Sequence, residues 1–330
     1  MEAISLNNIA IKSMVTALPN NTVKIDGVSV PYSVENQTAS DLAFEAASKI
    51  LTQEDINEIG VLLLLTSTPD YRSPASAMVI QTRLGVDVNC IVYDINISMN
   101  SFAYGLQVAG SLLQNSSKQK ALVLLADTPS KQFDFLQDNT MRLADGATAI
   151  CLEKINNQKE FNFYNLTRSE YFKTISLKNG GYRDARSQGD HEPYTNLEKL
   201  TPLHINVEGY KKNEIEMLAY ALNKLEVKSE INLKKIFTNL RTSEKLSKLI
   251  KVSDIDKGRF VDTQNEFQLL GSFIPNEMNK ETIDLAEMVS VAFGEGLSVS
   301  LLSMELDFKK ISKTFHTDNY YENGEVAHQI

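Results

Sequence analysis

Two serines in the uncharged run SMNS, Ser98 and Ser101, have side chains that could support nucleophilic chemistry. A serine hydroxyl attacks an acyl group only when a positioned base takes its proton. Met99 lies between the two serines and has no titratable proton, so its expected role is to fill space in a core. None of the four histidines is expected to be that base. His191 lies in a polar link, His204 precedes an extended segment, and His316 and His328 lie in the tail.

The two cysteines, Cys90 and Cys151, both lie inside apolar runs. We expect them to be small core residues rather than a disulfide, which fits a reducing compartment. No cysteine and histidine cluster has metal-ligand spacing, and the sequence contains neither a G-x-G-x-x-G run nor a P-loop. The sequence therefore predicts no metal and no other cofactor.

The bulk composition indicates a globular protein of the cytoplasm. The chain has 330 residues, 42% hydrophobic and 23% charged. A formal net charge of −9 argues against bulk nucleic-acid binding, which favours a basic surface. The longest apolar run, Val61 to Leu65, suits a buried strand and is too short to span a membrane. The N-terminus lacks the pattern of a secretory signal, so we expect neither membrane association nor export.

Buried strands alternate with helical patterns along the chain. The runs at 61–66, 90–95 and 121–126 are typical of strands, and the periodicity of 102–113 predicts a helix. The order of helix, strand and Gly-containing strand pair recurs later in the chain, which predicts two similar α/β halves. We place the halves at 1–178 and 203–330, with an irregular link at 179–202 and a polar, frayed tail after Phe315.

Four segments, in order and at suitable spacing, resemble the ketoacyl-acyl-carrier-protein synthase III family. TSTPDYRSPASAMVIQTRLG resembles a T-T-P-D-Y run before a helix ending in R-L-G, and LADGATAICLE resembles an F-G-D-G-A-G-A strand entry. LKNGGYRDA resembles a Gly-Gly-Ser-Arg loop, and VAFGEGLSVSLL resembles a closing F-G-A-G-F strand pair. The resemblance implies a five-layered thiolase fold, usually dimeric.

The resemblance also implies three catalytic positions. In that family a cysteine at a helix N-terminus takes an acyl group, while a histidine and an asparagine stabilise the enolate of the malonyl donor. Aligning its D-I-S-A-A-C-S-G-F run with DINISMNSF puts Met99 at the cysteine. Aligning P-H-Q-A-N with KIFTNLRT puts Asn239 at the histidine and Thr242 at the asparagine of that run. Counting back from Ile274-Pro275 puts Gln268 at the catalytic asparagine. All three catalytic side chains are therefore expected to be missing.

Two further features bear on ligands and partners. Family members that bind CoA carry a tryptophan and an arginine pair ahead of the first long helix, and residues 20–39 here contain neither. Arg241, Lys245 and Lys248, followed by Lys251, recur at helical spacing opposite an apolar stripe. In the family such cations meet an acidic carrier protein. We therefore predict carrier-protein docking at this face, with an ordinary solvated face as the alternative.

Three functions remain open from the sequence. The first is a synthase III-like pseudoenzyme subunit that assists an active ketosynthase in making a fatty-acid or polyketide-type metabolite. The second is a divergent acyltransferase with Ser98 or Ser101 as nucleophile, and the third is an acyl-binding protein. The nearly uncharged segment from Cys90 to Gly110 predicts a covered interface. We expect a heterodimer with an active paralogue, or a homodimer.

Overall fold

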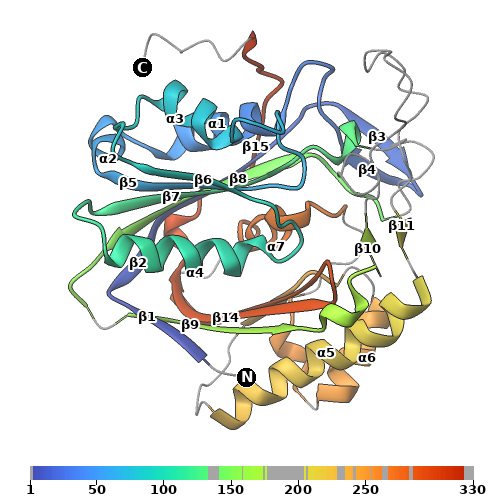
Figure 1. Ribbon diagram of the computed structural model, residues 1–330. Coiled ribbons are helices and arrows are strands. Elements are labelled where there is room, and N and C mark those ends of the chain that lie inside the picture. The colour runs from blue at the N-terminus through green and yellow to red at the C-terminus, as the bar shows by residue number, and fades with distance from the viewer. Residues whose placement is uncertain are drawn as a thin grey trace.

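The chain forms two main β-sheets separated by a helical layer, as the computed structural model shows (Figure 1). The structure describes residues 3–132, 141–157, 159–173, 175–176, 204–205, 207–228, 235–240, 243–253, 255–261, 267–281 and 285–322. The predicted link at 179–202 and the Gly-Gly loop at 177–185 lie outside these residues. Within the described parts, no helix is long and apolar enough to cross a membrane.

The first sheet has six strands, in the spatial order β15 (Phe315–His316), β2 (Ile9–Leu18), β8 (Gly146–Lys154), β7 (Lys120–Asp127), β5 (Ile59–Leu65) and β6 (Ile91–Ile95). The second has five, in the order β1 (Ala3–Asn7), β9 (Glu160–Thr167), β14 (Ser298–Asp307), β13 (Leu285–Gly294) and β12 (Lys235–Thr238). Two short pairs complete the strands: β3 (Thr22–Ile25) with β4 (Val28–Pro31), and β10 (Ile175–Ser176) with β11 (His204–Ile205).

Helices cover and separate the sheets. Figure 1 shows α1 (Ala39–Ile50), α2 (Gln53–Asn57) and α3 (Ser76–Leu84) on the outer face of the first sheet, and α4 (Ser101–Gln114) and α7 (Phe273–Met278) between the sheets. On the far side of the second sheet lie α5 (Val207–Lys228) and α6 (Ser243–Ser253). The five layers are those that the sequence analysis expects.

The apolar composition of β5 explains why it lies at the centre. Every residue from Ile59 to Leu65 is buried, and alternate residues enter different cores. Leu63 packs in the core that contains α4, whereas Leu62 and Leu64 pack in the core beneath α1 and α3. A strand that is apolar on both faces is stable only where helices cover both faces of its sheet.

The internal repeat is visible in the strand pairing. In the first sheet β7 pairs in parallel with β5 and antiparallel with β8. In the second, β13 pairs in parallel with β12 and antiparallel with β14. The two sequence copies therefore build equivalent parts of two sheets, and α4 contacts strands of both.

The prediction of a frayed tail after Phe315 is wrong for the described residues up to 322. Residues 315–316 form β15 beside β2. The Asp318 carboxylate accepts hydrogen bonds from Asn20, and the Tyr321 hydroxyl donates to the Glu45 carboxylate on α1. The guanidinium of buried Arg83 lies 5.0 Å from the centre of the Tyr321 ring. Long-range partners order this segment despite its polar composition.

Both cysteines are free thiols, as expected. Cys151 is fully buried in β8, and burial raises its pKa to about 12. Cys90 is only partly buried, at the edge of the core beneath α1 and α3, and burial raises its pKa to about 11. Neither thiol is activated for nucleophilic chemistry, because the thiolate is the reactive form.

Candidate functional site

Met99 lies two residues before the start of α4, in the layer between the two sheets. Its side chain is 4% exposed and belongs to the apolar core around α4. A thioether in an apolar core makes dispersion contacts and offers no proton or thiolate. The side chain of Met99 therefore packs the site, and its backbone is the part that remains available for polar contacts.

The backbone N–H of Met99 faces the carboxylate of Glu295. The nitrogen lies 3.3 Å from each carboxylate oxygen, although the two residues are 196 positions apart in the chain. Glu295 is partly buried, in the turn between β13 and β14. Burial raises the pKa of Glu295, while hydrogen bonds from the Met99 N–H and the Ser98 hydroxyl lower it.

A second carboxylate, that of Asp127, lies on the other side of Ser98. The Ser98 hydroxyl is 3.5 Å from Asp127 Oδ2, at the weak limit for a hydrogen bond. Asp127 is 3% exposed at the end of β7 and accepts hydrogen bonds from the Ser67 N–H and hydroxyl at 2.8 and 2.9 Å. Burial raises the pKa of Asp127 to about 7, and the nearby Glu295 charge contributes to the rise.

Asn239, predicted at the histidine position, follows β12 and is bound to the neighbouring strand. Its amide nitrogen donates to the Phe293 carbonyl at 2.7 Å, and its amide oxygen accepts from the Phe293 N–H at 3.0 Å. Phe293 is two residues before Glu295 on the same hairpin. The Asn239 side chain therefore secures the hairpin backbone, and Thr242 lies outside the described residues.

Gln268, predicted at the asparagine position, lies beside the start of β8. Its backbone N–H donates to the Arg142 carbonyl, its carbonyl accepts from the Ala144 N–H, both at 2.8 Å, and its side chain is buried. Among the described residues, Gln268 Oε1 has no hydrogen-bond partner. The same is true of the buried hydroxyl of Ser101.

The segment after Gln268 reaches the start of α4. A methyl group on Gly271 would lie 1.8 Å from Ser101 Oγ and 2.9 Å from the Ser98 carbonyl, so only glycine fits this approach. The structure thus brings the segments of Met99, Asn239 and Gln268 around the N-terminus of α4. Their role as former catalytic positions stays a prediction.

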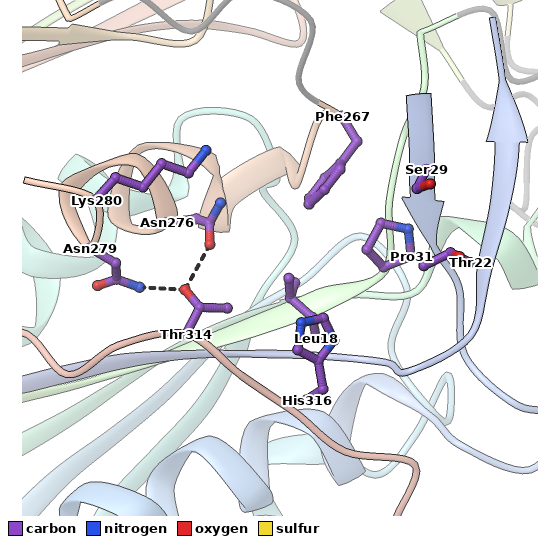
Figure 2. Close-up of a pocket in the computed structure, with 10 residues that line it drawn as sticks. All are labelled: Leu18, Thr22, Ser29, Pro31, Phe267, Asn276, Asn279, Lys280, Thr314 and His316. Atoms are coloured by element: carbon purple, nitrogen blue, oxygen red, sulfur yellow. Dashed lines mark hydrogen bonds between the residues drawn. The ribbon is translucent and has the colours of Figure 1, made fainter. Parts of the chain in front are cut away.

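A cavity of about 490 Å³ opens next to Phe267, the neighbour of Gln268 (Figure 2). Thr314 donates a hydrogen bond to Asn276 Oδ1 and accepts one from Asn279, each at 2.9 Å, along one wall. The hairpin of β3 and β4 forms another wall, within the stretch that lacks the CoA-binding residues of the resemblance. The lining residues are Leu18, Thr22, Ser29, Pro31, Phe267, Asn276, Asn279, Lys280, Thr314 and His316.

Comparison with known proteins finds sequence similarity to one family. Residues 93–168 match the family model described as 3-oxoacyl-[acyl-carrier-protein (ACP)] synthase III. The chain is 26% identical over 298 residues to beta-ketoacyl-[acyl-carrier-protein] synthase III of Clostridium perfringens, covering 82% of this chain and 86% of that protein. The chain is therefore similar in sequence to proteins of the synthase III family.

Other relatives match over less of their length. A synthase III of Halalkalibacterium halodurans is 29% identical over 165 residues, which is 49% of this chain and 49% of that protein. The fold is shared more widely than the sequence. The crystal structure of a 3-oxoacyl-(acyl-carrier protein) synthase from Burkholderia xenovorans LB400 superimposes with a TM-score of 0.83 at 19% identity, over 96% of this chain and 99% of that one. The chain therefore has the thiolase-like fold of synthase III structures.

The predicted docking cations lie on α6 or just before it. Arg241 is outside the described residues. Lys245 Nζ lies 2.5 Å from the buried carboxylate of Glu214 on α5, and Lys248 Nζ lies 2.6 Å from Glu244. Of these two lysines, Lys248 is the more exposed, at 62% of its side chain against 28%. The charges of these two lysines are therefore partly neutralised, one by a carboxylate of α5 and the other by a carboxylate of α6.

Glu295 and Asp127 were not identified as site residues from the sequence. Glu295 lies in the run F-G-E-G-L, at the position where the synthase III run F-G-A-G-F has alanine. A charged residue among small and apolar ones is therefore the sequence feature that could have identified it. Asp127 ends an apolar strand and gave no comparable signal. Only the packing of β7, α4 and the hairpin of β13 and β14 shows that they share a site.

Proposed function

We propose that this chain is a synthase III-like subunit without condensing activity of its own, which assists an active paralogue in fatty-acid or polyketide-type metabolite biosynthesis. The observation that carries the proposal is the contact between Met99 and Glu295. Acyl transfer in such a site needs a thiolate beside free N–H donors that can stabilise an oxyanion. Here position 99 has no thiol, and its N–H donates to a carboxylate instead.

The arrangement of Asn239 supports the same proposal. Both polar ends of its amide are engaged by the Phe293 backbone, so the side chain has a structural task. An enolate-stabilising residue must direct a donor at the substrate. When catalytic residues act as a unit, removal of one of them also removes most of the enzyme's rate enhancement. A second substitution at position 239 leaves little basis for condensation.

The exposed edge of the first sheet supports a partner. β6 is the last strand of that sheet, and Tyr93 on it is 55% exposed. Met78 on α3 and Val88 just before β6 are 47% and 90% exposed. An open strand edge with apolar side chains favours pairing with another chain. The occupant that we propose is a second synthase III-type chain, seated on the β6 end of the segment from Cys90 to Gly110. The later part of that segment, from Ser98 to Gly110, is largely buried within the chain itself.

One observation favours the acyltransferase alternative. The Ser98 hydroxyl lies between two carboxylates, and a carboxylate with a pKa near 7 is a possible general base. Against it, the 3.5 Å separation from Asp127 is long and Ser98 is 2% exposed. The test below separates this alternative from the proposal.

The test is incubation of the purified protein with acyl and malonyl thioesters, followed by intact-mass spectrometry and product analysis. We expect neither an acyl adduct nor a β-ketoacyl product from the chain alone. Co-expression with a tagged, cysteine-bearing paralogue should yield a complex that forms product. Product from the chain alone would overturn the proposal. An acyl adduct mapped to Ser98 or Ser101 would establish the acyltransferase alternative instead.

A further inference from the structure

The turn that carries Glu295 is hydrogen-bonded to Asn100, the residue just before α4. Asn100 Nδ2 donates to Ser298 Oγ at 2.7 Å, and Ser298 Oγ donates to the Glu295 carbonyl at 2.8 Å. The first contact joins residues 198 positions apart, and the second lies within the turn itself. They hold the turn against α4 independently of the Glu295 carboxylate.

The approach is also sterically close. A methyl group on Gly294 would lie 1.5 Å from Asn100 Oδ1, so this position accepts only glycine in the observed packing. On the other side of Gly294, Asn239 binds the backbone of Phe293. The backbone on one side of Glu295 is thus fixed by Asn239, and that on the other by Ser298. These two attachments of the backbone orient the Glu295 side chain toward Met99.

We propose that Glu295 is a built-in block of this site, whose carboxylate occupies the place beside the Met99 N–H where an acyl oxygen would otherwise bind. A helix N-terminus favours negative charge, and a carboxylate of the chain itself satisfies that preference. A second negative charge at position 99, whether a thiolate or an oxyanion, would be repelled. This inference deepens the proposed function, since it names a second obstacle to acyl transfer besides the missing thiol.

A second carboxylate, that of Asp127, lies near the block. The charge of Glu295 contributes to the raised pKa of Asp127. Burial raises the pKa of Glu295 above its ordinary value, and hydrogen bonds from the Met99 N–H and the Ser98 hydroxyl oppose this rise. A thiol introduced at position 99 would therefore face one carboxylate directly and a second one beyond Ser98.

The experiment measures the ionisation of a thiol placed at position 99. Iodoacetamide alkylation of the variants M99C and M99C/E295Q is followed by peptide mass spectrometry from pH 5 to 10. The reaction forms a carbon–sulfur bond, breaks the carbon–iodine bond and releases iodide, and the proton of the thiol goes to solvent. Because only the thiolate reacts, the pH profile reports the pKa of the thiol.

We expect the M99C thiol to react slowly at pH 7.5, and the M99C/E295Q thiol to react about tenfold faster or more, corresponding to a pKa lower by about one unit. The matched control is M99C/E305Q, which removes a charge from the exposed end of the same hairpin and should react like M99C. Thermal unfolding of each variant confirms that the fold is retained. M99C/E295A, with the alanine of the family run, replaces the glutamine variant if that one does not fold.

Equal alkylation rates with and without Glu295, including equally slow ones, would overturn the block. So would an increase of the same size in M99C/E305Q. Neither result depends on a paralogue or on condensation, so the block can fail while the proposed function stands. Conversely, an active wild-type chain would overturn the proposed function and leave the thiol measurement unaffected.

Discussion

The side-chain amide of Asn239 and the backbone of Phe293 form a closed pair of hydrogen bonds, 2.7 Å from Nδ2 to the carbonyl and 3.0 Å from the N–H to Oδ1. In this pair, the donor and the acceptor of one planar side-chain amide bind the carbonyl and the N–H of a single residue of β13. It ties the end of β12 to the hairpin that carries Glu295, so a residue at a predicted catalytic position has become a structural clamp.

Replacing Asn239 should therefore destabilise the fold. In N239A the buried N–H and carbonyl of Phe293 lose their side-chain partner, at a cost of roughly 1–3 kcal/mol for each group. N239H introduces the histidine that the resemblance predicts for this position. A histidine cannot donate and accept in the same plane as the amide, so N239H should also lower stability and give no condensation. Urea unfolding measures the loss. The control N20A removes an exposed amide bonded to Asp318 and should cost about 1 kcal/mol or less. Equal stability of N239A and N20A would contradict the clamp.

Asp127 should make stability depend on pH in an unusual direction. Its folded pKa of about 7 lies above the ordinary value of 3.8, so folding takes up a proton between these limits. The wild type therefore loses this contribution as pH rises from about 4 to 7. We expect the melting temperature of D127N relative to wild type to increase between pH 4 and 8. A difference that stays constant across this range would show that Asp127 does not titrate there.

Asp55 provides the opposite case. Although burial raises its pKa, hydrogen bonds from Lys12 and Lys120 lower the pKa far below its ordinary value. That contribution is complete above the ordinary pKa and is lost only as pH falls through the acid range. D55N should therefore be destabilised by a nearly constant amount between pH 5 and 8. The pH dependence of stability therefore distinguishes Asp127, a buried carboxylate near another negative charge, from Asp55, a carboxylate paired with two lysines.

The layers could be predicted from the sequence because β5, β7 and α4 carry their own periodicity. The contact between Met99 and Glu295 could not, since no local pattern relates residues 196 positions apart. The tail after Phe315 was mispredicted for the same reason: its partners, among them Arg83 and Glu45, lie far away in sequence. A motif comparison located the segments of the candidate site, but it did not show which side chains fill it.

Carrier-protein docking at α6 can be tested by reversing two of the predicted docking charges. We expect R241E/K248E to weaken binding to an acidic carrier protein several-fold, and added salt to weaken wild-type binding in the same way. Lys245 is a poor choice, since its reversal would also leave the buried Glu214 unpaired. The control K24E reverses an exposed charge on β3. Affinity measured by calorimetry should fall only in the double variant. Unchanged affinity would identify the face as solvated surface.

Assembly through β6 is the remaining prediction. Tyr93 is 55% exposed on the open edge of the first sheet. A charged side chain at this position should stay in contact with water in a monomer, but it would be buried without a partner in a dimer that forms through β6. If the predicted dimer forms, Y93E should shift it toward monomer and abolish co-purification with a tagged paralogue. V252E, a charge at an equally exposed position on α6, should change neither. Size-exclusion chromatography with light scattering measures the oligomeric state. A monomeric wild type would contradict the predicted interface. A chain that forms only a homodimer in the presence of the paralogue would contradict the helper-subunit proposal.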